Sequence, residues 1–264
     1  MTTALITGAS SGLGAEFARQ LAAQGHGLVL VARDEDRLQR LAAGLRSRTG
    51  VEVQVLPADL TDQAQLSAVV DRVADTARPV GILVNNAGIG LLHDFDRNPL
   101  EDEVRHLRLH VEATMSLCHA ALGAMTARRE GRIVNVASIA AYLPRGSYSA
   151  AKAWTLSFSR WANLHYRREG VLVTALCPGF VHTEFHERMG MSKRLIPPFL
   201  WLRAPRVVRE GLLDNLRGKA VSIPSRRYKA VALMSHVLPR RLLVGPRRRP
   251  SRQPPLRQLH DADG

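Results

Sequence analysis

The chain has 264 residues, of which 45% are hydrophobic and 23% charged, the composition of an ordinary globular protein with a substantial core. Its net charge of +14 is concentrated in residues 193–257, where 17 Lys and Arg face two acidic residues, and no recognition motif supports a specific nucleic-acid partner. The two cysteines, Cys118 and Cys177, lack metal-like spacing, and neither a signal peptide nor a membrane-spanning run is evident, so we expect a cytoplasmic protein with buried thiols and no metal site.

Short apolar runs alternate with longer amphipathic runs over the first 180 residues, which predicts parallel strands that alternate with helices. The expected strands cover residues 4–7, 27–31, 51–56, 82–84, 132–136 and 172–176, and a last strand starts near residue 219. The expected helices lie near residues 13–24, 35–48, 62–77, 99–127 and 148–168. We therefore predict an α/β protein with one doubly wound domain over residues 1–223, whose ligands bind at the carboxyl ends of the strands.

A glycine-rich stretch, TGASSGLG, follows the first strand and leads into the first helix. Glycines there allow a tight turn and a close approach of the backbone to a pyrophosphate, whose charge is favoured at the N-terminus of a helix. The alternative is a turn that serves helix packing alone. The residues predicted to bind a dinucleotide in this stretch are Gly8, Ser10, Ser11, Gly12, Leu13 and Gly14.

The end of the second strand carries Arg33 directly after Ala32. An arginine there favours the 2′-phosphate of NADP, whereas an acidic residue would hold the ribose hydroxyl of NAD. We therefore expect NADP(H) to be preferred over NAD(H), with the neighbouring Asp34 weakening the preference. The alternative is that Arg33 merely pairs with surface carboxylates.

Two further loops follow the third and fourth strands. Asp59 and Leu60 fall where a carboxylate and a backbone amide could read an adenine edge, but Asp59 or Thr61 could equally cap the next helix. The turn NNAG leaves room for a flat ribose. Its predicted cofactor-binding residues are Asn86, Ala87 and Gly88.

Tyr148 precedes Lys152 by four residues in the helical segment SYSAAKAW, so both lie on one face of a helix, roughly 6 Å apart. At that distance an ammonium group stabilises a phenolate and lowers the pKa of the phenol toward neutrality, as a general acid/base requires. The alternative is a surface pair that only meets water.

Five motifs in register resemble those of the short-chain dehydrogenase/reductase family. They are TGxxxGxG at 7–14, NNAG at 85–88, the serine of NVASIAA at 138, YSAAK at 148–152 and PGFVHT at 178–183, and the resemblance covers about residues 3–223. It implies a Rossmann-type domain with a mainly parallel seven-stranded sheet and helices on both faces, and hydride transfer between a nicotinamide cofactor and a carbonyl or alcohol carbon. Within the family the chain looks like the broad-range carbonyl reductases related to 3-oxoacyl and hydroxysteroid reductases.

The resemblance also implies a role for each residue of the site. Tyr148 exchanges a proton with the substrate oxygen, and Lys152 lowers the pKa of Tyr148 and holds the nicotinamide ribose. Ser138 donates a hydrogen bond that orients the carbonyl. The residues expected to meet the nicotinamide are Pro178, Gly179, Val181 and Thr183.

Two positions depart from the family pattern. His110 stands where the family carries an asparagine that helps to hold a water chain behind the lysine, so it either continues a proton relay or has a purely structural role. Ser138 precedes Tyr148 by ten residues, fewer than is usual in the family, which shortens the loop over the active site.

Residues 184–202 are expected to form a substrate lid, because their apolar side chains suit a small hydrophobic carbonyl or alcohol. Packing onto the core or a partner subunit is the alternative. The apolar residues of this segment are Phe185, Met189, Met191, Leu195, Ile196, Phe199, Leu200 and Trp201.

An aromatic stripe of Trp154, Phe158 and Trp161 lies on the fifth predicted helix, turned away from Tyr148 and Lys152. It favours either the pairing of subunits into a homodimer or homotetramer or packing within the core.

Residues 224–244 combine apolar residues at helical spacing with basic ones, which predicts an amphipathic helix that contacts an anionic membrane surface or closes the substrate pocket. Residues 245–264 are rich in proline and arginine and are predicted to be disordered. The function indicated first is NADPH-dependent reduction of a hydrophobic ketone or aldehyde, or the reverse oxidation. The alternatives are a non-catalytic dinucleotide-binding protein and a lipid carbonyl reductase at a membrane surface.

Overall fold

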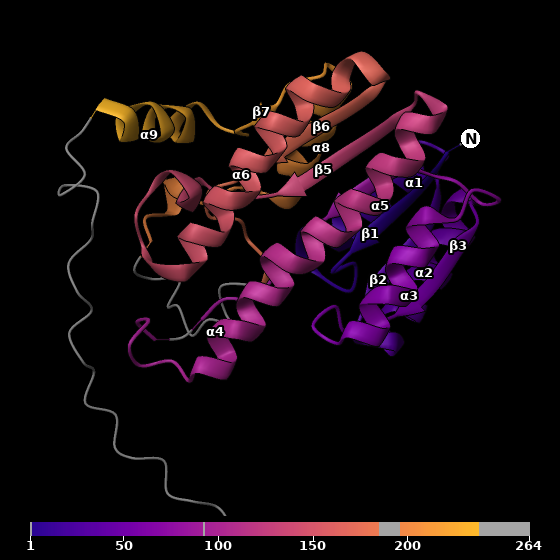
Figure 1. The fold of residues 1–264 in the computed structure, drawn as a ribbon, viewed down its shortest axis with the longest axis horizontal. Coiled ribbons are helices and arrows are strands. Elements are labelled where there is room, and N and C mark those ends of the chain that lie inside the picture. The colour runs from indigo at the N-terminus through magenta and orange to yellow at the C-terminus, as the bar shows by residue number, and fades with distance from the viewer. Residues whose placement is uncertain (1, 92, 185–195, 238–264) are drawn as a thin grey trace, which may run out of the picture.

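The computed structural model describes residues 2–91, 93–184 and 196–237. Its centre is a sheet of seven strands in the order β3-β2-β1-β4-β5-β6-β7, in which all neighbours are parallel (Figure 1). The α/β fold and the seven-stranded parallel sheet expected from the sequence are thereby confirmed. The strands are β1 (Thr3–Thr7), β2 (Gly27–Ala32), β3 (Val53–Pro57), β4 (Val80–Asn85), β5 (Gly131–Val136), β6 (Val171–Leu176) and β7 (Val221–Ser222).

Helices cover both faces of the sheet (Figure 1). One layer consists of α1 (Gly12–Ala23), α2 (Glu35–Thr49) and α8 (Ala204–Leu216), and the other of α3 (Gln63–Ala74), α5 (Ala113–Arg128) and α6 (Gly146–Tyr166). Outside these layers lie α4 (Leu100–Leu107) and α9 (Arg226–Val237), together with short helical turns at Arg108–Glu112, Ile139–Tyr142, Arg167–Glu169 and Pro198–Leu200.

The inner strands are buried on both faces, which explains why each of them reads as an almost continuous apolar run. Along β1, Ile6 belongs to the same buried cluster as Phe17 of α1, whereas Leu5 belongs to the opposite cluster with Leu117 of α5. The expected burial of the free thiols is confirmed, and it raises the pKa of each to about 12, which makes them poor nucleophiles. These are Cys118 and Cys177.

The strand order reverses at β1, whose neighbours are β2 on one side and β4 on the other. The loops that leave β1 and β4 therefore diverge and open a crevice at the carboxyl ends of the strands. This is where the sequence places the glycine-rich stretch and the NNAG turn.

The prediction of one continuous helix over residues 99–127 is wrong in one respect. A π-turn at Arg108–Glu112 separates two α-helices, α4 and α5. A π-turn carries an extra residue and so re-aims the side chains that follow it. His110 lies in the middle of this turn and is buried. Periodicity alone does not reveal such a turn, since the apolar spacing on either side continues.

The C-terminal quarter is described only in part. Of the helix predicted over residues 224–244, α9 covers Arg226–Val237. The tail at 245–264 and the lid residues 185–195, including Phe185, Met189, Met191 and Leu195, lie outside the described residues. In the described ranges, no helix is both long and apolar enough to cross a bilayer.

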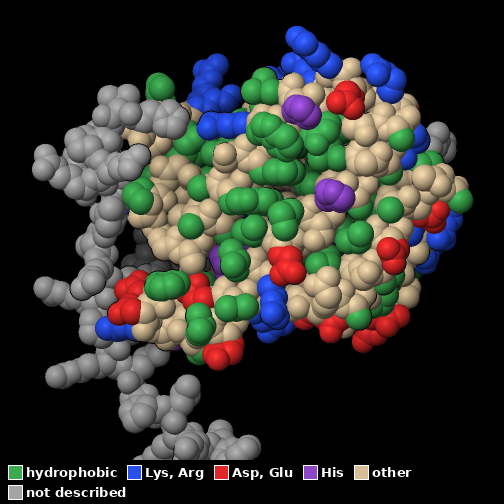
Figure 2. All heavy atoms as spheres, viewed as in Figure 1, with side chains coloured by type: hydrophobic (Ala, Val, Ile, Leu, Met, Phe, Trp, Pro, Cys, Tyr) green, Lys and Arg blue, Asp and Glu red, His purple; other side chains and the backbone are tan. Residues whose placement is uncertain are grey.

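The outer face of α5 and α6 carries exposed apolar side chains, and Figure 2 shows hydrophobic groups across the middle of this side of the molecule. Trp154 stacks on Phe158 with 5.2 Å between ring centroids, whereas Trp161 is 50% exposed and Leu164 is 78% exposed. The predicted stripe is thus partly packed within α6 and partly open to solvent. A homodimer or homotetramer that covers it stays a prediction.

Candidate active site

A cavity of about 1060 Å³ occupies the crevice at the carboxyl ends of the strands. It brings together all the site residues predicted from the sequence except Gly14. The lining residues among them are Gly8, Ser10, Ser11, Gly12, Leu13, Arg33, Asp59, Leu60, Asn86, Ala87, Gly88, His110, Ser138, Tyr148, Lys152, Pro178, Gly179, Val181 and Thr183.

The glycine-rich loop is shaped by backbone geometry that only glycine adopts easily. Gly8 and Gly12 have φ of 64° and 55°, in the left-handed region. Gly14 lies behind the loop: a Cβ there would stand 2.1 Å from the carbonyl oxygen of Gly8. Gly14 does not line the cavity and has a packing role, which lets α1 start close beneath the loop, so its contact with a cofactor stays a prediction.

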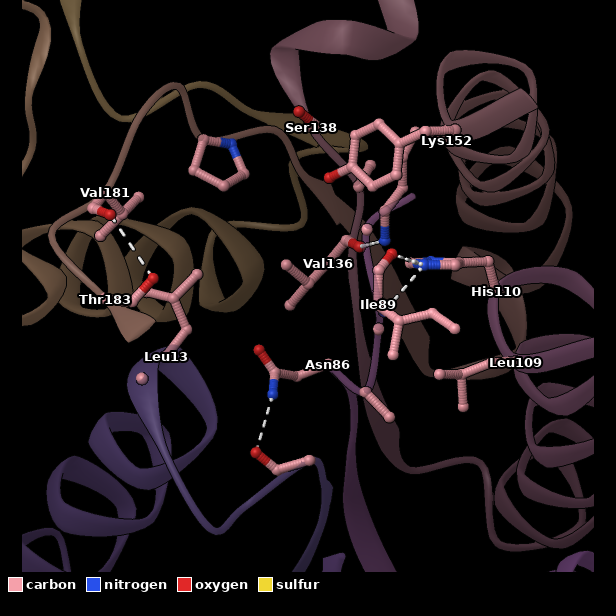
Figure 3. Close-up of a pocket in the computed structure, with 18 of the residues that line it drawn as sticks. Leu13, Asn86, Ile89, Leu109, His110, Val136, Ser138, Lys152, Val181 and Thr183 are labelled. Carbon is pink, nitrogen blue, oxygen red and sulfur yellow. Dashed lines mark hydrogen bonds between the residues drawn. The ribbon is translucent and has the colours of Figure 1, made fainter. Parts of the chain in front are cut away.

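Asn86 fastens the NNAG turn to the glycine-rich loop (Figure 3). Its Nδ2 donates to the carbonyl oxygens of Thr7 at 2.9 Å and Gly8 at 3.2 Å. The Thr7 hydroxyl in turn accepts from the backbone amides of Asn86 and Ala87, each at 3.0 Å. The two loops therefore form one rigid floor beneath the cavity.

Basic side chains surround the far end of the cavity, next to β2 and β3. Arg33 and Arg105 approach the same oxygen of Asp59 at 3.7 and 3.3 Å. Burial works to raise the pKa of Asp59, but hydrogen bonds from Thr61 and these two arginines hold it below its ordinary value. The alternative in which Arg33 pairs with a carboxylate is thus present. Asp59 accepts a hydrogen bond from the Thr61 amide within its own turn, whereas the N-cap of α3 is Asp62.

Arg37 was missed by the sequence reasoning and lines the same end of the cavity. It contacts Glu184 at 2.9 Å and Asp34 at 3.3 Å. Because Asp34 also caps α2 by accepting from the Arg37 amide, its carboxylate is engaged beside the cavity. With Arg33 and Arg105, Arg37 brings the guanidinium groups at this end of the cavity to three, where the sequence pointed to one.

Ser138, which follows β5, and Tyr148 and Lys152, which lie on α6, all line the cavity. Figure 3 shows Ser138 and Lys152 on the same side of it. The Lys152 Nζ lies 5.9 Å from the centroid of the Tyr148 ring, close to the predicted separation. The same Nζ donates to the carbonyl oxygen of Val136 at 2.7 Å, which fixes the ammonium group above β5.

The prediction that the pKa of Tyr148 is lowered is wrong for the protein chain without a bound cofactor or substrate. Burial raises the pKa of Tyr148 to about 12, and the hydrogen bond with Ser138 opposes this only in part. Burial also lowers the pKa of Lys152 to about 8. The desolvation of the phenolate thus outweighs the hydrogen bond with Ser138, and the cost of desolvation depends on depth and cannot be read from spacing.

His110 is held against the NNAG turn. Its Nε2 lies 2.8 Å from the carbonyl oxygen of Ile89 and 3.1 Å from the Ile89 amide, and its ring leaves no room for a Cβ at Gly88. The His106 ring lies 4.3 Å from the His110 ring, and both rings lie within 6.0 Å of Tyr148. His106 was missed by the sequence reasoning, although it precedes His110 by four residues, a spacing that places two side chains on the same face of a helix.

Both imidazoles are neutral at neutral pH. Burial, and then the charge of Lys152, lower the pKa of His106 to about 4 and that of His110 well below 6.5. The His106 Nε2, the His110 Nδ1 and one carboxylate oxygen of Glu103 are buried without a hydrogen-bond partner among the described residues. This cluster is a polar patch behind Tyr148 and Lys152 that can hold water.

Replacing His110 by asparagine should preserve most of the activity and flatten the acidic limb of the pH profile. In the wild type, His110 gains a proton as pH falls through its lowered pKa, and the new charge repels Lys152. The profile of kcat/KM between pH 4.5 and 9 tests this, with the exposed His119→Asn on α5 as the matched control. Superimposable profiles for wild type and His110→Asn would remove His110 from the mechanism.

The wall opposite Tyr148 is formed by the loop after β6 and by apolar residues. Thr183 lies across from the glycine-rich loop, where a Cβ at Gly12 would stand 3.3 Å from its side chain. Other apolar lining residues include Ile89, Leu143, Phe180, Leu200 and Val231. Of the predicted lid, Ile196 is buried, whereas Phe199 is 59% exposed.

Comparison with known proteins decides the family. A sequence model described as short chain dehydrogenase matches residues 2–193. The chain belongs to this family. It is therefore an oxidoreductase that acts on alcohol and carbonyl groups.

Relatives of this short-chain dehydrogenase cover most of its length. The oxidoreductase UcpA of Salmonella typhimurium is 34% identical over 189 residues, 70% of this chain and 71% of the relative. A short-chain dehydrogenase from Sphingobium yanoikuyae, solved in complex with NADPH, is 36% identical with a TM-score of 0.82, covering 90% of this chain and 94% of that one. The bulky-bulky ketone specific alcohol dehydrogenase from Comamonas testosteroni is 32% identical with a TM-score of 0.78, covering 90% and 93%.

Proposed function

We propose that this short-chain dehydrogenase uses NADPH to reduce a hydrophobic ketone or aldehyde, or oxidises the corresponding alcohol. The observation that carries the proposal is the convergence of Ser138, Tyr148 and Lys152 beside an apolar wall in one large cavity. A relative named for bulky ketones and one solved with NADPH support the same substrate and cofactor classes.

The cavity fits a dinucleotide. At the floor, a Cβ at Gly8 would stand 2.9 Å from the backbone of Ala87, so the loop is open only because side chains are absent. The glycine-rich loop would hold the pyrophosphate. Arg33 and Arg37 would bind the 2′-phosphate, and Asp59 and Leu60 would contact the adenine. When bound, the nicotinamide supplies or accepts the hydride. The residues proposed beside it are Asn86, Ala87, Gly88, Pro178, Gly179, Val181, Thr183, Tyr148 and Lys152.

The residues of the chain itself position the substrate and transfer the proton. The Ser138 hydroxyl donates a hydrogen bond to the carbonyl oxygen and holds it beside the phenol. With its pKa raised to about 12, Tyr148 stays protonated at working pH and is ready to donate its proton to that oxygen, which suits reduction. Lys152, charged below a pKa of about 8, stabilises the phenolate that remains.

Removing the two guanidinium groups should change cofactor preference. The double variant Arg33→Ala, Arg37→Ala should raise the KM for NADPH about tenfold or more, because a charge-assisted contact to phosphate contributes ~1.5–3 kcal/mol, and should change the KM for NADH less than about twofold. Steady-state kinetics with both cofactors measure this, with the exposed Arg40→Ala on α2 as control. Equal losses with both cofactors would contradict the preference for NADPH.

The proposed function is tested by NADPH consumption with a panel of ketones and aldehydes of graded bulk. Turnover that depends on Tyr148 supports it. Tight NADPH binding without turnover of any compound would favour the alternative of a non-catalytic dinucleotide-binding protein.

Four expectations from the sequence stay predictions: the cytoplasmic location, the homo-oligomer, the domain boundary at residue 223 and the disordered tail. Contact of the C-terminal segment with an anionic membrane finds no support in the relatives. The alternative, that this segment closes the substrate pocket, agrees with the described part of α9: Tyr228 and Ala232 are buried, and Tyr228 lines the cavity.

A further inference from the structure

Tyr228 of α9 is packed directly against the loop that follows β6. Its side chain is buried, with 4% of the residue exposed, and a Cβ added at Gly179 would stand 1.9 Å from the ring carbon Cζ. The glycine at position 179 therefore makes room for an aromatic ring from a helix that lies far along the chain. Figure 1 shows α9 apart from both helical layers, and this contact is one of those that tie it to the catalytic part of the molecule.

The Tyr228 hydroxyl joins two segments that both border the cavity. It accepts a hydrogen bond from the backbone amide of Phe180 at 3.1 Å and donates one to the carbonyl oxygen of Leu200 at 2.7 Å. Phe180 belongs to the loop proposed to meet the nicotinamide, and Leu200 to the end of the predicted lid. One phenol thus satisfies a donor in one segment and an acceptor in the other.

These two segments are also paired with each other. The Leu202 amide donates to the Phe180 carbonyl at 2.8 Å, and the His182 amide donates to the Leu202 carbonyl at 3.0 Å. Trp201 packs on His182 with 4.7 Å between ring centroids. The loop after β6 and the end of the lid therefore form a single unit, and Tyr228 is its link to α9.

The same helix supplies part of the substrate wall. Val231, one turn beyond Tyr228, lines the cavity together with Leu200. Arg227 donates to the carbonyl oxygen of Phe199 and lies 5.4 Å from the centroid of its ring. Two consecutive residues of the lid end, Phe199 and Leu200, are thus in contact with α9.

We propose that α9 is a specificity element of the active site, in which Tyr228 is a positioning residue and Val231 limits the bulk of the substrate. Tyr228 holds the loop after β6 and the end of the lid in a fixed position relative to each other. A change in the shape of the substrate wall is therefore coupled to a change in the position of the loop beside the nicotinamide. The inference rests on the proposed function, since it assumes that a carbonyl compound occupies the apolar side of the cavity.

Tyr228→Phe tests the positioning role, because it removes the hydroxyl and keeps the ring against Gly179. The Phe180 amide then loses its acceptor, so hydrogen exchange should rise about tenfold or more in residues 178–183 and 198–202 and stay unchanged in the glycine-rich loop. We expect kcat to fall about tenfold and NADPH affinity to change less than about threefold. A merely structural role would instead raise exchange throughout the chain and lower the melting temperature.

Val231→Trp tests the specificity role. It should lower kcat/KM for the bulkiest ketones of a graded series about tenfold relative to the smallest, with NADPH affinity unchanged, whereas Val231→Ala should shift the preference the other way. Leu233→Trp is the matched control, because this residue of the same helix is 66% exposed and does not line the cavity.

The proposal is overturned if Tyr228→Phe leaves exchange in both segments unchanged, or if the Val231 and Leu233 variants give the same rank order of ketones as the wild type. Failure of the proposed function is a separate result, because the wild-type chain would then turn over no carbonyl compound at all. The exchange measurement needs no substrate, so it decides the positioning role in either case.

Discussion

Replacing Tyr148 by phenylalanine should lower kcat for carbonyl reduction about 10³-fold, while NADPH binds as tightly as to the wild type. The phenol is the proposed proton donor, and a positioned general acid typically contributes 10²–10⁴-fold. The substitution keeps the ring and its contacts with His106 and His110, so the cavity retains its shape. Single-turnover loss of NADPH with a saturating ketone measures the chemical step, and fluorescence titration measures binding.

The control is Tyr166→Phe, which removes a hydroxyl from the other end of α6 and should leave kcat unchanged. The pH dependence gives a second check on the wild type. Because the pKa of Lys152 is lowered to about 8 and that of Tyr148 is raised to about 12, reduction should decline as pH rises through 8, when the lysine loses its charge. Activity of Tyr148→Phe within tenfold of the wild type would refute the assignment of the proton donor.

The fold was predictable because burial on both faces leaves a direct mark on the sequence. In a parallel sheet covered by helices, each strand must be apolar throughout, so runs such as residues 27–31 and 132–136 stand out against the amphipathic helices. The strand ends then locate the site by topology alone. The glycine-rich loop and Arg33 follow from that step. Tyr148 and Lys152 follow from their spacing of four residues on a helix, and the role of Ser138 follows from the family resemblance.

What the sequence could not supply are contacts between distant segments and the cost of burying charge. Arg37 forms an ion pair with Glu184, which lies 147 residues further along the chain, and Tyr228 bridges two loops, yet neither Arg37 nor Tyr228 stands in a motif. The lowered pKa predicted for Tyr148 failed for a related reason. Spacing fixes the distance to Lys152, but the energy of a phenolate depends on how deeply it is desolvated.

Gly14 belongs to the glycine-rich motif but lies behind the cavity, so we expect it to act on cofactor binding through packing. We expect Gly14→Ala to raise the Kd for NADPH about 100-fold or more and to lower the free energy of unfolding by ~1–3 kcal/mol or more. The added Cβ would stand 2.1 Å from the carbonyl oxygen of Gly8 and 2.6 Å from the Nδ2 of Asn86. Relief of either clash must move α1 away from the loop or break the bonds that Asn86 makes to it.

The matched control for Gly14→Ala is Gly123→Ala, in the interior of α5, where an added Cβ meets nothing within 4 Å. There the substitution should raise the free energy of unfolding by ~0.5–1 kcal/mol, because alanine restricts the unfolded chain and favours helix. NADPH titration and denaturant unfolding of the two variants separate the effect of the clash from that of losing a glycine. If Gly14→Ala bound NADPH like the wild type, the close approach of α1 to the loop would not be what shapes the site, and the packing role assigned to Gly14 would be wrong.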